Sequence, residues 1–415
     1  MEKAPSRFPA PSYPLDRRRS GGWPAVLALT LCVSTLITSE FMPVSLLTPV
    51  ASSLRISEGQ AGQAIAISGI LAVFTSLFIA PASRNVDRRP LLLGLTALMI
   101  ASGAIIAFAS NYVVFMAGRA LLGVVIGGFW SMSTATVMRL VPKAAVPKAL
   151  ALLNGGNALA TTVAAPLGSY LGQFIGWRGA FFCVVPLACA TLAWLFKTLP
   201  ALPNHERASG IAALRVLRRP QVPLGMASVA LLFMGQFALF TYLRPFLEGV
   251  TGVGVTTFSL ILLVLGLAGL AGTVAIGFAL KRSLYGLLAA MPLAMAAIAA
   301  GLVAAGHSPG IVTVLLVLWG FVGTAAPVAW WTWVSRVLPG EAEAGGGLMV
   351  AVVQLAITLG AGVGGILFDR LGHQATFLAS SALLISSAAA ALAAARTPSN
   401  AAGPADPSNA ALAAH

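Results

Sequence analysis

Long apolar stretches alternate with short polar segments along most of the chain. A membrane-crossing helix needs about 20 predominantly apolar residues. Stretches of that length are expected at 24–50, 62–82, 91–110, 112–138, 149–172, 179–197, 222–247, 256–279, 284–305, 310–335, 346–368 and 374–395. They lack the roughly ten-residue alternating segments that are typical of an outer-membrane barrel. The pattern therefore predicts an all-α membrane protein with twelve transmembrane helices.

The longest polar interval between these helices, 198–221, combines prolines with a basic cluster and is expected to be a cytoplasmic linker. It separates two six-helix bundles, 23–197 and 222–395. The remaining ends are a cytoplasmic N-terminal tail, 1–22, and a tail rich in Ala, Pro and Ser, 396–415, which we expect to be disordered and cytoplasmic.

Several residues recur at a nearly constant offset of about half the chain, as expected for an internal duplication. RLVP at Arg139–Pro142 returns as RVLP at Arg336–Pro339, Gly123 as Gly320, Gly176 as Gly372, and Phe181 as Phe377. The two bundles should therefore be pseudo-symmetric, with a substrate site between them near the middle of the membrane.

Composition agrees with a bilayer environment, since 58% of residues are hydrophobic, 9% are charged and the mean hydropathy is +0.91. A soluble domain has about 25% charged residues. The net charge of +14 could indicate a nucleic-acid partner, so the positions of the charges matter.

Most Lys and Arg residues fall on one side of the expected topology, which is the positive-inside bias of membrane proteins. That side carries Lys3, Arg7, Arg17, Arg18, Arg19, Arg84, Arg88, Arg89, Arg139, Lys143, Lys148, Lys197, Arg207, Arg215, Arg218, Arg219, Lys281, Arg282, Arg336 and Arg396, against Arg55, Arg178 and Arg370 opposite. The excess charge thus reflects orientation: both termini are expected in the cytoplasm of a bacterial cell, with the chain in the inner membrane and no nucleic acid bound. The stretch 24–50 exceeds the apolar core of a signal peptide, about 7–15 residues, and should be retained.

Catalytic and metal-binding machinery is not evident. The cysteines Cys32, Cys183 and Cys189 lie inside expected helices, and the histidines lie in loops or tails. No metal, nucleophile or phosphate-loop motif is recognisable. We expect a protein that is not an enzyme, needs no cofactor or metal and does not use ATP directly.

Ionisable residues inside the expected helices are candidates for function, because a central charge costs at least about 2.5–3.5 kcal/mol on insertion scales. Glu40 lies near the middle of 24–50, and Pro43 should free a carbonyl around Ser39 and favour a kink. Glu40 is a candidate proton carrier; the alternative is a structural hydrogen bond or ion pair. Arg119 could balance Glu40 or extend to the outer interface. Arg244 is expected to anchor the outer interface, with substrate contact as the alternative.

Uncharged polar and aromatic residues within the helices are candidates for binding substrate. The polar set is Asn154, Asn157, Gln236 and Gln354, and the aromatic set is Phe129, Trp130, Phe240, Tyr242 and Trp330. Amides can bind hydroxyl or amide groups of a neutral ligand, and rings can stack on a planar one. Helix packing and an interfacial aromatic belt are the alternatives.

Four segments resemble the major facilitator superfamily, specifically its bacterial twelve-helix drug-proton antiporter branch and, within it, purine ribonucleoside efflux pumps. They read SEFMPVSLLTPVASSLRISEGQAGQ, GRALLGVVIGGFWSMSTATVMRLVP, AAPLGSYLGQFIGWRGAFF and GQFALFTYLRPF. The resemblance implies that Arg119 occupies the helix-four arginine position associated with proton coupling. Pro166 and Gly168 fall in the helix-five antiporter motif, although Ala165 replaces a glycine there.

The loop after the second helix, SRNVDRRPL, departs from the family pattern of an aspartate, a glycine and several basic residues. Arg84 stands at the aspartate position and Asp87 at the glycine position, while Arg88 and Arg89 keep the basic pair. These residues, together with Pro166 and Gly168, are expected to take part in conformational change.

The resulting hypothesis is secondary active efflux by alternating access, in which inward proton flow drives export of a small molecule, with a purine ribonucleoside or analogue as the favoured cargo. Its partners would be substrate, protons and lipid. Export of sugars or drugs, uncoupled uniport, and a membrane sensor without transport remain alternatives.

Overall fold

A computed structural model describes residues 22–82, 86–202, 216–338 and 342–397, and every regular element in these ranges is helical. The N-terminal half contains α1 Trp23–Leu54, α2 Glu58–Ala82, α3 Arg88–Ala107, α4 Tyr112–Leu140, the short 3₁₀ helix η2 Lys143–Ala145, α5 Val146–Phe182 and α6 Val184–Thr198. The C-terminal half contains α8 Gln221–Phe240, α9 Leu243–Gly249, α10 Val255–Ala279, α11 Leu284–Ala304, α12 Pro309–Val337 and α13 Ala342–Arg396.

The described helices account for the expected twelve crossings. Ten of them are long and apolar enough to span a bilayer, and two of these ten, Lys143–Thr198 and Gly345–Arg396, are 56 and 52 residues long. Each of the two can cross twice, because one crossing takes about 20 residues. The prediction of an all-α membrane protein is confirmed.

Two connections that the sequence predicts as loops, 173–178 and 369–373, are instead single breaks within long helices. α5 turns at Gly176, with φ 70° and ψ 169°, and α13 turns at Gly372, with φ 78° and ψ −177°. Only glycine adopts this combination readily, because it has no Cβ. One residue thus reverses the chain, which is why no separate loop is needed.

Replacing Gly176 or Gly372 by Ala is expected to lower the thermal stability of the protein, because a Cβ in this backbone region costs about 1–3 kcal/mol. Thermal unfolding of the purified variants measures the effect. Gly155→Ala is a matched control, since Gly155 is helical and a Cβ there meets open space. Equal melting temperatures for Gly372→Ala and Gly155→Ala would contradict the expectation.

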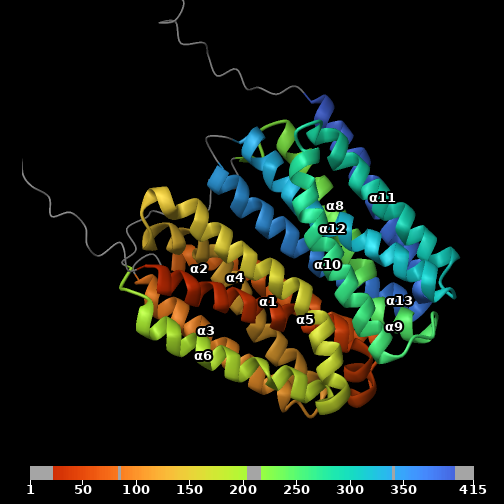
Figure 1. Cartoon of the computed structure of the whole chain (residues 1–415), viewed down its shortest axis with the longest axis horizontal. Helices are drawn as coiled ribbons and strands as arrows, with labels where there is room; N and C mark the ends of the chain where they lie inside the picture. Colours follow the sequence, from red (N-terminus) through yellow and green to blue (C-terminus); the bar gives the residue numbers. More distant parts are fainter. Residues whose placement is uncertain (1–21, 83–85, 203–215, 339–341, 398–415) are drawn as a thin grey trace, which may run out of the picture.

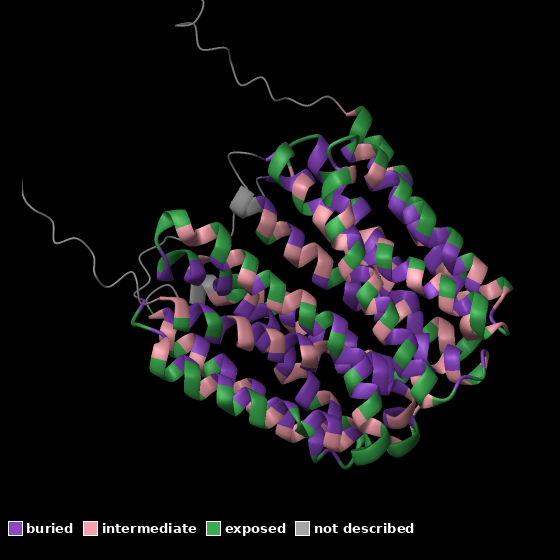
Figure 2. Ribbon diagram, in the orientation of Figure 1, coloured by how far each residue is buried: buried purple, intermediate pink, exposed green. Residues whose placement is uncertain are grey.

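The helices form two bundles that lie side by side, with α1 to α6 in one and α8 to α13 in the other (Figure 1). Each bundle has its own buried apolar core: Leu29 and Phe129 belong to the N-terminal one, and Trp319 and Trp333 to the C-terminal one. Buried residues line the inside of the bundles and exposed residues their outside (Figure 2). Many of the exposed residues are large and apolar, such as Phe278, as expected for a surface that contacts lipid.

The internal repeat seen in the sequence is also present in three dimensions. Gly176 and Gly372 share one backbone conformation, and Phe181 and Phe377 are both buried. A Cβ on Gly123 would collide with the Ser68 carbonyl of α2, and a Cβ on Gly320 with the Leu265 carbonyl of α10. Equivalent helices therefore cross at equivalent glycines in the two halves.

Helices α8 and α9 replace the single helix predicted at 222–247. The chain leaves the helical path at Tyr242, with φ −102° and ψ 18°. Pro245 explains the break, because it has no amide proton for the Thr241 carbonyl, its partner in a continuous helix. The break gives α9 a new direction and carries Arg244 toward α1.

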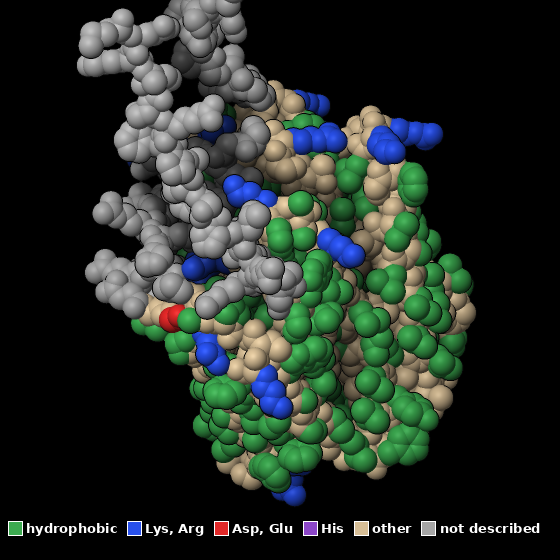
Figure 3. Space-filling view, turned by 60° about the vertical axis from the view of Figure 1, so that its left-hand side comes forward, with side chains coloured by type: hydrophobic (Ala, Val, Ile, Leu, Met, Phe, Trp, Pro, Cys, Tyr) green, Lys and Arg blue, Asp and Glu red, His purple; other side chains and the backbone are tan. Residues whose placement is uncertain are grey.

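One end of the molecule, which we call the basic end, carries the start of α1, the end of α13 and most of the described basic residues. These are Arg88, Arg89, Arg139, Lys143, Lys148, Lys197, Arg218, Arg219, Lys281, Arg282, Arg336 and Arg396. The opposite end, the far end, carries Arg55, Arg178 and Arg370. Most blue side chains in Figure 3 gather toward the basic end, and hydrophobic side chains cover much of the remaining face.

The two halves are joined by hydrogen bonds in the part of the molecule nearer the far end. Gln63 Nε2 of α2 donates to the Gly362 carbonyl of α13 over 3.1 Å, and Ser259 of α10 donates to Ser169 of α5 over 2.9 Å. Asp369 and Arg244 make further bonds near the far end.

Candidate functional site

Helix α1 contains two prolines beyond its first turn, and each leaves a backbone carbonyl without its intrahelical donor. Pro43 cannot donate to the Ser39 carbonyl, nor Pro49 to the Ser45 carbonyl, since each lies four residues upstream. In the structure an arginine fills each vacancy. Arg119 Nη1 donates to Ser39 over 2.8 Å, and Arg244 Nη1 donates to the Ser45 carbonyl.

Arg119 lies on α4 and is completely buried. Besides Ser39, its Nε donates to the Ala64 carbonyl of α2 over 3.1 Å and its Nη2 to the Glu40 carbonyl over 3.4 Å. The Arg119 carbonyl in turn accepts the Ser68 hydroxyl of α2 over 2.8 Å. One guanidinium thus ties three helices together at the inside of the bundle. The alternative that Arg119 extends to the membrane interface is wrong.

Glu40 lies near the middle of α1, in the same helical turn as the carbonyls that Arg119 binds. Its carboxyl group interacts electrostatically with Arg119 and with the side-chain amide of Gln354, which belongs to α13 in the other half. Arg119 is fully buried, whereas Glu40 is only partly buried. The carboxyl group is therefore influenced by a buried cation of its own half and by an amide of the other half.

Aromatic rings and an amide extend this site toward α8. Phe41 follows Glu40 in α1, and its ring centroid is 6.0 Å from that of Phe237, which in turn lies 6.2 Å from Phe240. Gln236 precedes Phe237, and its Oε1 is buried without a hydrogen-bond partner. An unpaired buried acceptor is unfavourable, so this oxygen has a hydrogen-bonding capacity that the described residues do not use.

Arg244 and Tyr242 lie in the contact between the halves rather than at an outer membrane interface. Arg244 is only 4% exposed, and its Nε donates to Glu248 over 2.8 Å. Its guanidinium also lies over the Phe258 ring. Tyr242 is fully buried and donates to the Ala361 carbonyl over 2.6 Å. The expectation of an interfacial anchor at Arg244 is thus wrong, because the side chain bonds to α1.

Several predicted substrate residues lie away from Glu40. Phe129 and Trp330 are buried in the separate apolar cores of the two halves, and Trp130 packs against the N-terminal one. Asn154 is exposed, and its amide donates to Leu150 of its own helix over 3.0 Å. Asn157 is partly buried on the same helix, α5. The structure therefore brings together Glu40, Arg119 and Gln354, places Gln236 and Phe240 on the neighbouring helix α8, and leaves these five outside the group.

The predicted conformational residues of the second loop make contacts within the N-terminal half, except Arg84, which lies outside the described residues. Asp87 caps α3 by accepting from the Arg89 amide over 2.7 Å, and it also accepts from the Leu202 amide. The amide of Arg88, which is buried, donates to the Leu202 carbonyl. Arg89 Nη2 donates to the Phe196 carbonyl over 2.9 Å. These bonds hold the segment after α6 against α3.

The predicted antiporter-motif residues place α5 close to α1. Pro166 is buried, and a Cβ on Gly168 would lie 3.0 Å from the Ser45 hydroxyl oxygen of α1. Close to this point, Ser169 accepts the hydrogen bond from Ser259 of the other half. The motif therefore lies where α1, α5 and α10 approach one another.

Residues that the sequence reasoning missed include Gln63, Ser45 and Asp369, which all join the halves. The argument used for Pro43 would have found the Ser45 carbonyl if it had been applied to Pro49. Asp369 is one of only 11 acidic residues in the chain. A negative charge that is so rare, beside an expected helix end, could have marked it as a candidate functional residue.

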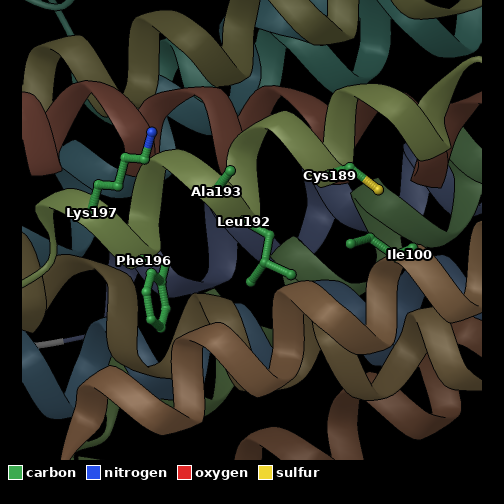
Figure 4. A pocket seen from close by; sticks show the side chains of 6 residues that line it. All are labelled: Ile100, Cys189, Leu192, Ala193, Phe196 and Lys197. Atoms are coloured by element: carbon green, nitrogen blue, oxygen red, sulfur yellow. The ribbon is translucent and has the colours of Figure 1, made fainter.

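A surface pocket of about 370 Å³ lies elsewhere, between α3 and α6. Its lining is apolar, with Ile100, Leu192 and Phe196, and only Lys197 carries a charge (Figure 4). Glu40 does not take part in it. The pocket opens on the outside of the N-terminal bundle, so it is not the candidate site.

Comparisons with known proteins place this geometry in a family context. The sequence model of the Major Facilitator Superfamily matches residues 27–354. The chain is 58% identical over 383 residues to the Transcription regulatory protein OpdE of Pseudomonas aeruginosa, covering 91% of this chain and 95% of that one. It is 40% identical over 380 residues to the Purine ribonucleoside efflux pump NepI of Escherichia coli, covering 92% and 96%. Its fold is similar to that of a bacterial homologue of the lysosomal transporter Spinster, solved in an inward-facing and occupied conformation, with a TM-score of 0.72, 15% identity and coverage of 92% and 98%.

Proposed function

Because the chain belongs to the major facilitator superfamily, we propose that this membrane transporter is a proton-coupled exporter of a small neutral molecule, with a purine ribonucleoside as the favoured cargo. The observation that carries the proposal is the partly buried Glu40 carboxyl group between the halves, beside the buried Arg119 and the Gln354 amide of the other half.

In this proposal the chain lies in the inner membrane of a bacterial cell, and the basic end faces the cytoplasm. The far end then faces the outside and is called the outer end from here on. Cationic segments resist translocation, so the end rich in Lys and Arg stays inside. Both chain termini would then be cytoplasmic, since α1 begins and α13 ends there.

The pattern of contacts between the halves supports alternating access. The bonds at Gln63, Ser259 and Asp369 hold the outer side together. Such an arrangement suits a state that takes up substrate from the cytoplasm. Rocking of the two bundles about the central site would then open the outer side.

Proton flow is coupled to substrate export if the same carboxyl group binds the proton and the substrate alternately. Ionised Glu40 is balanced by Arg119 and can accept hydrogen bonds from ligand hydroxyl groups. A proton arriving from the outer side removes the negative charge and turns one acceptor oxygen into a donor, which weakens the bonds to the ligand hydroxyl groups and favours release of the ligand there. The bonds of Arg119 to the Ala64 and Ser39 carbonyls do not involve the Glu40 carboxyl group, so protonation of Glu40 leaves the Arg119 charge in place.

The charges of the site favour a neutral ligand. The guanidinium groups of Arg119 and Arg244 already bind backbone carbonyls, and Arg244 also binds Glu248. An anionic ligand would thus meet Glu40 without finding an uncommitted cation in the described part of the site. Phe41 and Phe240, which are only partly buried, offer ring faces for a planar base. The name of the Escherichia coli relative points to the same class of cargo.

Transport by proteoliposomes tests the proposal. With an imposed pH gradient, we expect concentrative accumulation of labelled inosine or adenosine, together with proton movement in the opposite direction. A matched panel contains the nucleoside monophosphate, a neutral sugar and a cationic drug. Accumulation of the sugar or drug instead would favour the alternative cargoes, and nucleoside flux without proton movement would indicate a uniporter.

A regulatory function is a second candidate, because a relative that is 58% identical bears the name of a transcription regulatory protein. Transcript levels in a deletion strain that carries either wild-type protein or the Glu40→Gln variant would test it. If the variant restores transcript levels without transporting any of the panel, regulation is independent of transport. If only the transporting protein restores them, the regulatory effect follows from export.

A further inference from the structure

Two charged side chains of the C-terminal half cross the outer end and bind backbone groups of the N-terminal half. Asp369 of α13 accepts from the Gly59 amide over 2.9 Å and from the Ser57 hydroxyl over 2.5 Å. Arg244 of α9 donates to the Ser45 carbonyl of α1. Both contacts join the halves at the end that must open for release.

The Asp369 contact uses a backbone amide at the start of a helix, where the first amides have no acceptor within the helix. α2 begins at Glu58, so the Gly59 amide lies in the first turn and has no acceptor within its own helix. Negative charge is favoured beside a helix N-terminus. Asp369 thereby supplies the cap of α2 from the opposite half, and it is exposed at the surface.

The Arg244 contact uses the carbonyl that Pro49 leaves without a donor. Helix α1 itself cannot satisfy Ser45 at this point, and the break between α8 and α9 directs Arg244 to it. Glu248 holds the guanidinium from its own helix, and the Phe258 ring lies beneath it. The contact therefore depends on Pro49 of α1 and on three features of the C-terminal half: the break between α8 and α9, Glu248 and Phe258.

Both contacts can be exchanged for water. When the halves separate at the outer end, the Gly59 amide and the Ser45 carbonyl come to line an aqueous opening, where water can replace the lost partners. Bonds of this kind bias a two-state equilibrium without locking it, as a transporter that cycles between two states requires.

We infer that Asp369 and Arg244 are gating residues of the outer end, which stabilise the inward-facing state by binding backbone groups that their own helices leave unpaired. This inference rests on alternating access in the proposed function, but not on the cargo or on proton coupling.

Distances between spin labels test the inference in full-length protein in lipid nanodiscs. Cys32, Cys183 and Cys189 are first replaced, so that only introduced cysteines react. One labelled pair, Ser110→Cys with Gly310→Cys, reports on the outer ends of the two halves, where both positions are exposed. A second pair, Lys143→Cys with Arg282→Cys, reports on the cytoplasmic ends.

In Asp369→Ala, Arg244→Ala and Pro49→Ala, we expect longer outer distances and shorter cytoplasmic ones, with a shift in the ratio of the two populations of about tenfold per charged residue. Pro49→Ala is the sharpest variant, because the new amide at position 49 satisfies Ser45 within α1 and leaves both charges intact. Asp369→Asn should shift the ratio less, since one acceptor oxygen remains.

Arg178→Ala is the matched control. Like Arg244, Arg178 lies at the outer end and binds a backbone carbonyl, because it donates to Ala109 over 2.7 Å. That bond, however, lies within the N-terminal half. Unchanged distances in Asp369→Ala and Pro49→Ala would overturn the inference, and so would an equal shift in Arg178→Ala. Because the distances are measured without cargo, failure of the transport assay leaves this result interpretable.

Discussion

Concentrative export is expected to be lost when Glu40 is replaced by Gln. The amide has nearly the shape of the carboxyl group, so the neighbourhood of Gln354 and Arg119 should be preserved. It cannot, however, take up and release a proton, and inward proton flow then no longer drives the cargo. In proteoliposomes with an imposed pH gradient, the inside-to-outside ratio of labelled nucleoside should fall to the value without a gradient. Exchange of cargo at equal concentrations should remain measurable.

Glu58→Gln is the control for this experiment. Glu58 is a partly buried carboxyl group at the start of α2, at the outer end and away from the site, so its neutralisation should leave the accumulation ratio unchanged. Accumulation like that of wild type by the Glu40→Gln variant would show that the proton carrier is another group. Loss of both accumulation and exchange would instead indicate that Glu40 is needed to bind cargo.

The fold could be predicted from the sequence nearly to its helix ends. The length of the apolar stretches gives the crossings of the bilayer, and the distribution of Lys and Arg gives their orientation. The repeat at Gly176 and Gly372 was visible as an offset, and the structure adds that both residues reverse the chain with positive φ. The break at Tyr242 was not predicted. Pro245 lies near a helix end, where a proline gives the same local pattern whether the helix ends or merely turns.

The site could be predicted only for residues whose placement costs energy. Glu40 and Arg119 were identified because a charge inside a membrane is energetically costly and therefore marks a candidate for function. The structure places these two residues together. Aromatic and amide residues carry no such signal: Phe129 and Trp330 fill the cores of separate halves, while Gln236 has an unpaired oxygen. Which side of a helix faces the other half depends on packing between distant segments, and composition alone does not determine it.

Removing the side chain of Arg119 is expected to destabilise the N-terminal half strongly. Arg119→Ala leaves the Ser39 carbonyl without any donor, and an unpaired buried acceptor costs about 1–3 kcal/mol. It also removes the cation that balances the partly buried Glu40 carboxyl group. We expect a lower melting temperature and no concentrative export. Arg119→Lys should restore only part of the stability, since one ammonium group cannot bind Ser39, Glu40 and Ala64 in the same way as the guanidinium fork.

A second substitution separates the two roles of Arg119. Pro43→Ala creates an amide that can bond to Ser39 within α1, so in the Arg119→Ala background it should recover the part of the stability that was due to the orphaned carbonyl, about 1–3 kcal/mol. Export should not return, because Glu40 still lacks its counter-charge. Pro292→Ala in α11 is the matched control and should add independently to Arg119→Ala, since the two sites share no partner. If Pro43→Ala and Pro292→Ala give the same effect in that background, Arg119 does not stabilise the protein through the Ser39 carbonyl, and its contribution lies in the charge alone.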